Sequence, residues 1–243
     1  MKSILITGCS SGIGLAAARG LKARGYRVFP TARREEDLQK LRGEGFEALP
    51  LDLDDSASIR QAVEDLGALT GGRLDALFNN AGFGQWGAVE DLSRETLRAQ
   101  FETNLFGLVE LTNLILPWMR AQGAGRIVQN SSVLGLIAFP YRGAYVASKF
   151  ALEGLSDALR LELRGTGIHV SLIEPGPVRT KFRENAYRAF VRNIDRENSP
   201  HRGFYQILER RLQSKAPKSR FTQPPEAILK PLLHALESPR PRA

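Results

Sequence analysis

Short apolar runs alternate with amphipathic segments along most of the chain. Segments with helical periodicity separate the runs, at residues 13–24, 56–69, 93–121 and 144–164. This alternation predicts βαβ units and a parallel sheet with helices on both faces, and right-handed crossovers favour a doubly wound, Rossmann-like α/β arrangement. We see no linker and no repeat, so residues 1–243 are expected to form a single domain. The apolar runs, each a candidate buried strand, are 3–7, 26–31, 47–51, 74–79, 126–130 and 168–173.

The segment 144–164 carries apolar side chains on more than one side of the predicted helix. One apolar stripe is enough to dock a helix on a sheet, so a second stripe needs another partner. Two explanations stay open: a homodimer contact, or deep burial of this helix within its own chain.

Between residues 181 and 220 the periodicity gives way to a mixture of charged and aromatic side chains. Long irregular segments in compact domains are commonly functional. This one follows the last apolar run, at the carboxyl edge of the sheet where ligands bind. We therefore expect an irregular substrate lid over about 181–220.

Composition narrows the class of protein. Hydrophobic residues make up 42% of the chain and charged residues 25%, and no apolar stretch approaches the ~18 residues that suggest a membrane span. The N-terminus enters an apolar run at once with no signal-peptide cleavage site, and the lone Cys9 fits a reducing compartment, so a cytoplasmic location is expected. Lys and Arg give a net charge of +8 but are spread along the chain, which favours a solvated basic surface over nucleic-acid binding.

A glycine-rich turn follows the first apolar run and precedes the first helix. Glycines allow a tight turn and a close approach of the backbone to a pyrophosphate, and the helix N-terminus offers free N–H groups and partial positive charge. The position between strand and helix separates this turn from an ordinary tight turn. The residues expected to contact dinucleotide phosphates are Gly8, Ser10, Ser11, Gly12, Ile13 and Gly14.

A phenol and an ammonium lie four residues apart, at Tyr145 and Lys149. On a helix these side chains share one face and can meet a common ligand. Reduction of a carbonyl needs a hydride at carbon and a proton at oxygen, and a nearby cation lowers the pKa of a phenol from its usual value of about 10. Ser132 follows the fifth apolar run, where its hydroxyl could stabilise charge on the substrate oxygen. We choose it over Ser131 because of its spacing to Tyr145.

These motifs together resemble the short-chain dehydrogenase/reductase family. The turn has the form T-G-x-x-x-G-x-G, and further matches follow in family order over about residues 3–180. The resemblance implies a nicotinamide dinucleotide cofactor and an oxidoreductase activity. The matching positions beyond the turn are Asp52, Asn79-Asn80-Ala81-Gly82, Asn104, Ser132, Tyr145, Lys149 and Pro175-Gly176.

The resemblance also implies where the adenosine half of the cofactor lies. It places Asp52 and Leu53 near the adenine, and Asn80, Ala81 and Gly82 beside the adenosine ribose and the floor of the site. Asn80 has a compatible structural interpretation, as a side-chain bridge between strands.

Around the nicotinamide, the resemblance implies three further roles. Lys149 would hold the ribose hydroxyls, and Asn104 would hold a water that joins Lys149 to solvent as a proton relay, although a helix cap or kink is the alternative for that asparagine. The turn Pro175-Gly176, the backbone near Val178 and the hydroxyl of Thr180 would hold the carboxamide.

The end of the second apolar run bears on cofactor choice. An acid there would accept the ribose hydroxyls and repel a 2′-phosphate, but the chain has Ala32-Arg33-Arg34. Guanidinium groups bind phosphate through charge-assisted hydrogen bonds, so Arg33 and Arg34 predict NADP(H). The alternative is that both arginines only begin a surface helix.

The segment from Ser132 to Lys149 looks closest to the hydroxysteroid and retinol dehydrogenase branch and its bacterial aldehyde-reducing relatives, so we expect a lipophilic aldehyde, ketone or alcohol as substrate. An epimerase or dehydratase on the same scaffold, and a non-catalytic dinucleotide-binding regulator, are the alternatives. The three histidines are scattered, and we expect no metal. Family members usually continue into a seventh strand, so either the chain is truncated at Ala243 or its sheet ends one strand early.

Overall fold

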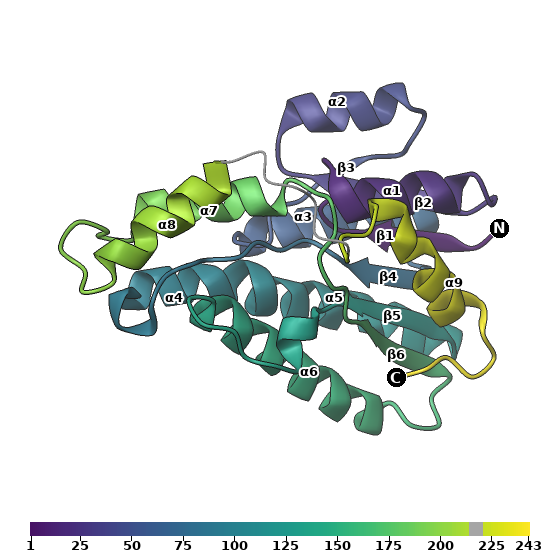
Figure 1. Cartoon of the computed structure of the whole chain (residues 1–243). Coiled ribbons are helices and arrows are strands. Elements are labelled where there is room, and N and C mark those ends of the chain that lie inside the picture. Colours follow the sequence, from purple (N-terminus) through teal and green to yellow (C-terminus); the bar gives the residue numbers. More distant parts are fainter. Residues whose placement is uncertain (214–220) are drawn as a thin grey trace.

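A computed structural model describes residues 1–213 and 221–243. Its sheet has six parallel strands in the order β3-β2-β1-β4-β5-β6. The order reverses between β1 and β4, so the predicted doubly wound, Rossmann-like sheet is confirmed. Figure 1 shows helices on both faces of the sheet. The strands are β1 Ser3–Ile6, β2 Arg27–Ala32, β3 Leu49–Pro50, β4 Ala76–Asn79, β5 Gly125–Asn130 and β6 Ile168–Ile173.

Two cores form because each strand is buried on both faces. Successive side chains of a strand point to opposite faces: Leu5 packs into the core on one side, and Ile4 and Ile6 into the core on the other. Helices α3 and α5, with part of α6, cover the first face, and α1, α2 and α9 cover the second. These helices are α1 Gly12–Lys22, α2 Glu35–Gly43, α3 Ser56–Thr70, α5 Gly107–Gln122, α6 Gly143–Glu162 and α9 Leu229–Glu237.

The expectation of an irregular segment over about 181–220 is wrong, because most of this segment is helical. Helix α7 spans Phe182–Asn193 and α8 spans Arg202–Gln213, while 214–220 lie outside the described residues. Charged side chains face outward and apolar ones inward on these short helices, which in sequence gives a mixture of charge and aromatics. The inward side chains form a third core together with residues that follow β4: Trp86, Ala88, Ala186, Phe190, Ile194, Tyr205 and Leu208.

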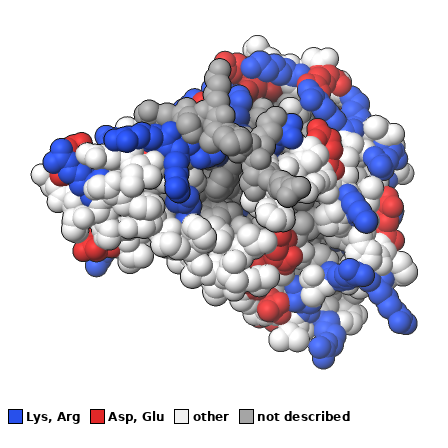
Figure 2. All heavy atoms as spheres, in the orientation of Figure 1, with Lys and Arg blue, Asp and Glu red and all other residues white. Residues whose placement is uncertain are grey.

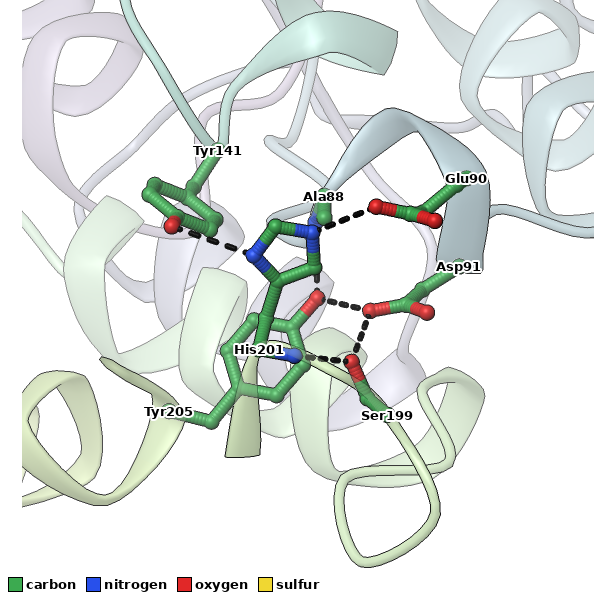
Figure 3. Close-up of polar contacts among 7 residues, drawn as sticks. All are labelled: Ala88, Glu90, Asp91, Tyr141, Ser199, His201 and Tyr205. Carbon is green, nitrogen blue, oxygen red and sulfur yellow. Dashed lines mark hydrogen bonds and ion pairs between the residues drawn. The ribbon is translucent and has the colours of Figure 1, made fainter. Parts of the chain in front are cut away.

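Polar contacts beneath α8 attach this helix pair to the 3-10 turn Val89–Asp91 (Figure 3). The buried hydroxyl of Tyr205 accepts a hydrogen bond from the backbone N–H of Ala88 (2.8 Å) and donates to the Asp91 carboxylate. Ser199 donates to the same Asp91 oxygen (2.6 Å). The helix pair is therefore anchored by buried, satisfied polar groups as well as by apolar packing.

His201 joins the helix pair to the loop that leads into α6. Its Nε2 donates to Glu90 (2.7 Å) and its Nδ1 pairs with the hydroxyl of Tyr141 (3.2 Å), as Figure 3 shows. The ring of Tyr141 also stacks on Phe204, with centroids 3.7 Å apart. Tyr141 has a φ of +59°, a conformation that non-glycine residues seldom adopt. These contacts thus hold a strained residue just before the helix that carries Tyr145.

After α9 the described residues run back along the sheet without forming a seventh strand. The carbonyl of Arg242 accepts a hydrogen bond from Ser171 of β6 (2.7 Å), which fixes this tail at the outer strand. None of the described helices has both the length and the apolar character needed to cross a membrane.

Candidate active site

The glycine-rich turn packs against two other loops at the carboxyl edge of the sheet. Gly12 has a φ of +61°, and a Cβ there would lie 2.8 Å from the Thr180 side chain. A Cβ at Gly14 would lie 2.4 Å from the Gly8 carbonyl. Helix α1 begins here with no acidic residue in its first turn and no side-chain cap from Ser11. The open N–H groups and the side-chain-free cradle fit a dinucleotide phosphate.

A network of amide and hydroxyl groups supports this turn from below. The hydroxyl of Thr7 accepts from the backbone N–H groups of Asn80 and Ala81, both at 2.9 Å. The Asn80 side chain donates to the Thr7 carbonyl (2.8 Å) and accepts from Asn130 Nδ2 (2.9 Å). Asn80 therefore bridges β1, β4 and β5, which is the structural interpretation left open from the sequence.

Tyr145, Lys149 and Ser132 come together as predicted, and all three are buried. The Ser132 hydroxyl lies near the phenol of Tyr145 and lowers its pKa as a hydrogen-bonding neighbour. The same hydroxyl accepts a hydrogen bond from the backbone N–H of Leu134 (3.1 Å). Lys149 Nζ lies 5.8 Å from the centroid of the Tyr145 ring and donates to the Asn130 carbonyl (2.7 Å). A phenol, a hydroxyl and an ammonium thus lie together in one water-poor group.

Burial is the largest influence on the pKa values of Tyr145 and Lys149. For Tyr145 the direction of the shift differs from the expectation. The pKa of Tyr145 is raised by burial, against a smaller lowering from the Ser132 hydrogen bond, although the sequence predicted a lowered value. The reason is geometric, since the Lys149 ammonium bonds a main-chain carbonyl and not the phenol. Burial also lowers the pKa of Lys149 to about 8, and the charge of Glu153 opposes that change.

Asn104 lies in a π-helical turn, Glu102–Phe106, that interrupts the single helix predicted over 93–121. Its Oδ1 accepts from the backbone N–H of Phe83 (3.1 Å), and its Nδ2 donates to the Phe83 carbonyl (3.0 Å) and to Ser148 of α6 (3.1 Å). Such turns mark functional positions in many helices. The side chain of Asn104 is occupied by protein partners, and the water relay that the resemblance implies for this asparagine stays a prediction.

The two arginines after β2 differ in their surroundings. Arg34 caps α2 and its guanidinium pairs with Asp37 and Glu36, each at 2.8 Å, as expected of a residue that begins a surface helix. Arg33 projects beside Asp52, with 3.8 Å between NH1 and Oδ1, and its side chain is 63% exposed. Arg33 is therefore the freer of the two to meet a phosphate near Asp52.

The loop after β6 lies between the glycine-rich turn and α7. The backbone N–H of Val133 donates to the Pro175 carbonyl (3.3 Å), and the hydroxyl of Thr180 accepts from the N–H of Phe182 (3.1 Å). Phe182 packs edge-on against the Tyr145 ring, with centroids 5.3 Å apart. The structure thus brings the residues expected around the nicotinamide to the same edge as Tyr145.

Glu153 was not predicted from the sequence. It accepts a hydrogen bond from Ser131 and lies one helical turn beyond Lys149. Its pKa is raised, chiefly by burial and also by Glu174 and Asp157, while Ser131 and Lys149 act in the opposite direction. Its spacing of four residues from Lys149 was the available signal. Glu153 is thus the counter-charge of the buried ammonium.

Comparison with known proteins identifies the class to which this site belongs. The model of the short chain dehydrogenase family matches residues 2–189. The uncharacterized oxidoreductase YbbO of Escherichia coli K12 is 44% identical over 241 residues, covering 99% of this chain and 83% of YbbO. Human 17-beta-hydroxysteroid dehydrogenase type 1 is 38% identical over 256 residues, covering 98% of this chain and 75% of that enzyme.

Solved structures agree with the sequence relatives. A variant of actinorhodin polyketide ketoreductase with NADPH superposes with a TM-score of 0.78 at 34% identity, covering 98% of this chain and 90% of the ketoreductase. The chain belongs to the short-chain dehydrogenase family. It is accordingly an oxidoreductase of the nicotinamide-dependent kind.

We predict that Glu153→Gln narrows the pH range of carbonyl reduction. The substitution keeps an acceptor for Ser131 but removes the charge that opposes the desolvation of Lys149, whose pKa of about 8 should therefore fall. Activity that requires the charged ammonium is present below this pKa and lost above it, so the alkaline limb of kcat/KM should move to lower pH by about half a unit to one unit. The exposed Glu162→Gln on the same helix is the control. An unmoved limb in an active E153Q enzyme would contradict this electrostatic role.

Proposed function

We propose that this protein interconverts a lipophilic aldehyde or ketone and its alcohol with NADP(H), with Tyr145 as the proton donor and acceptor. The observation that carries the proposal is the buried contact of Tyr145 with Ser132, one helical turn from Lys149 and at the same sheet edge as the glycine-rich turn. The bound dinucleotide supplies or accepts the hydride. A regulator that only binds a dinucleotide would not need this buried acid–base group.

The two hydroxyls act on the same oxygen. A carbonyl oxygen placed between Ser132 and Tyr145 would receive two hydrogen bonds, which stabilise the negative charge that develops on it. Tyr145 then passes its proton to this oxygen, and its raised pKa keeps the phenol protonated at neutral pH. The buried ammonium of Lys149 favours the anionic phenol left behind, because an opposite charge in a water-poor site interacts strongly.

A lipophilic substrate is supported by the side chains around the cleft. The loop between Ser132 and α6 exposes Leu136, Ile137 and Phe139, each more than half accessible. Phe182 at the start of α7 packs on the Tyr145 ring. We propose that this loop and the α7–α8 pair line an apolar substrate pocket and act as its lid. The hydroxysteroid dehydrogenase named above fits this class of substrate.

Replacement of the phenol is the direct test. Tyr145→Phe removes the transferable proton and should lower turnover of a good carbonyl substrate by about 100- to 10,000-fold. NADPH binding, followed by its fluorescence, should persist and would show that the fold is intact. A panel of retinal, steroid ketones and medium-chain aldehydes supplies the substrate. An undiminished rate in the phenylalanine variant would falsify the assignment.

Arg33 is proposed to select NADP(H). Its exposed guanidinium beside Asp52 can bind a 2′-phosphate at the end of β2. Arg33→Ala should raise KM for NADPH by about tenfold or more and leave NADH little affected, because a charge-assisted hydrogen bond contributes about 1.5–3 kcal/mol. Arg34→Ala should have a smaller effect, since Glu36 and Asp37 already hold that side chain. The assignment is wrong if the NADPH/NADH preference of R33A equals that of wild type.

We propose a homodimer built on α5 and α6, which lie side by side in Figure 1. Phe106, in the turn just before α5, and Phe150 and Leu161 of α6 are exposed. A patch of apolar side chains on two-fold related copies can cover itself. Light scattering at micromolar concentration should give about twice the chain mass of 26.9 kDa. Leu161→Glu should shift this mass toward the monomer, whereas a monomeric wild-type protein would remove the proposal.

A further inference from the structure

Arg142 is a partly buried cation next to the helix turn that carries Tyr145, and it has no assigned role. It immediately precedes α6, three residues before Tyr145, so the two side chains start within one helical turn of each other. Its guanidinium carbon lies 3.3 Å from the ring centroid of Trp86, and NH1 donates to the Tyr141 carbonyl (3.1 Å). The flat stack fixes the guanidinium and leaves its other N–H groups available.

Among the residues that the structure describes, this cation has no carboxylate as an ion-pair partner. Within the described residues neither Arg142 nor its neighbour Arg183 forms an ion pair, and the stretch 214–220 contains no Asp or Glu. Burial, together with a smaller contribution from the charge of Arg183, lowers the pKa of Arg142 to about 10. A guanidinium withdrawn from water without an acid is costly unless an anion joins it, and the nearby positive charge of Arg183 adds to that cost.

A third donor lies beside the pair. The indole N–H of Trp86 is buried and has no hydrogen-bond partner among the described residues. Arg183 donates one N–H to the Arg211 carbonyl (2.7 Å) and keeps others free. Its neighbour Phe182 contacts the Tyr145 ring, so the start of α7 reaches the reacting end of the cleft. Three separate segments therefore bring donors with unused hydrogen-bonding capacity into the neighbourhood of Arg142.

The surface that leads to this place is also basic. Helices α7 and α8 carry six arginines and two glutamates, and blue side chains gather over them in Figure 2. A field of one sign at the mouth of a cleft raises the local concentration of oppositely charged ligands.

We propose that Arg142 and Arg183 form an oxyanion-binding subsite, so that the substrate joins an apolar chain and a carbonyl to a carboxylate or phosphate group. The inference rests on the proposed function for the carbonyl, but the subsite is defined by its own donors. The apolar side chains of the surrounding loops contact the chain, and the paired guanidinium groups contact the charged end.

Binding can be measured without turnover. In a Trp118→Phe background the emission of Trp86 reports on its stack with Arg142. Octanoate and octyl phosphate should change this emission, octanol should not, and the tighter of the two anions identifies the charged group. Arg142→Met and Arg183→Met should each weaken anion binding by about tenfold or more, whereas the exposed Arg192→Met on the outer side of α7 should not. Equal affinity in R142M and the parent protein, or equal binding of octanol and octanoate, overturns the subsite.

Turnover separates this inference from the proposed function. An oxo fatty acid of medium chain length and its methyl ester differ only in charge. Wild-type enzyme should favour the acid by about tenfold or more in kcat/KM, and this ratio should fall toward one in Arg142→Met and be partly kept in Arg142→Lys. A folding defect would slow both substrates and leave the ratio unchanged. Turnover of the ester alone would overturn the subsite and keep the proposed reductase, while turnover of neither with NADPH would count against the reductase itself.

Discussion

A continuous run of hydrogen bonds joins the helix that carries Tyr145 to the glycine-rich turn, and the geometry of the whole site depends on it. Lys149 donates to the Asn130 carbonyl at the end of β5, Asn130 donates to Asn80 at the end of β4, and Asn80 donates to the Thr7 carbonyl at the end of β1. These groups are shielded from water, so each bond left unmade would cost about 1–3 kcal/mol. The ends of these strands therefore cannot shift independently, and the glycine-rich turn and the helix that carries Tyr145 keep a fixed position relative to each other.

The same helix concentrates buried charge. Lys149 has Glu153 as a counter-charge one turn away, and the hydrogen bond from Ser131 fixes that carboxylate. Arg142, at the start of the helix, has no such partner among the described residues and rests on an aromatic face. Desolvation lowers the pKa of both cations. Lys149, whose charge is opposed by Glu153, can remain charged as a permanent part of the acid–base group. Arg142, which has no such partner, is suited to binding a negatively charged ligand.

The sequence predicted the parts of the fold that one element determines alone. A strand that is buried on both faces must be apolar at every position, so the run Ile4, Leu5 and Ile6 is enough to predict β1. A turn with no room for side chains needs glycine, so the glycines identify the turn in the sequence. The helix pair α7–α8 escaped prediction because its core is shared with distant residues such as Trp86. The π turn at Asn104 and the role of Glu153 depend likewise on contacts made only after folding.

The net charge of +8 has two different physical meanings in this molecule. Several surface arginines pair with a nearby carboxylate, as Arg19 does with Glu44 and Arg27 with Glu47. Such pairs contribute little to stability and bind nothing in particular, which is the solvated basic surface expected from the sequence. Arg142 cannot be explained in this way, because a guanidinium withdrawn from water and left without an acid gains from neither solvation nor pairing. Arg142 is therefore the part of the positive charge for which we propose a ligand.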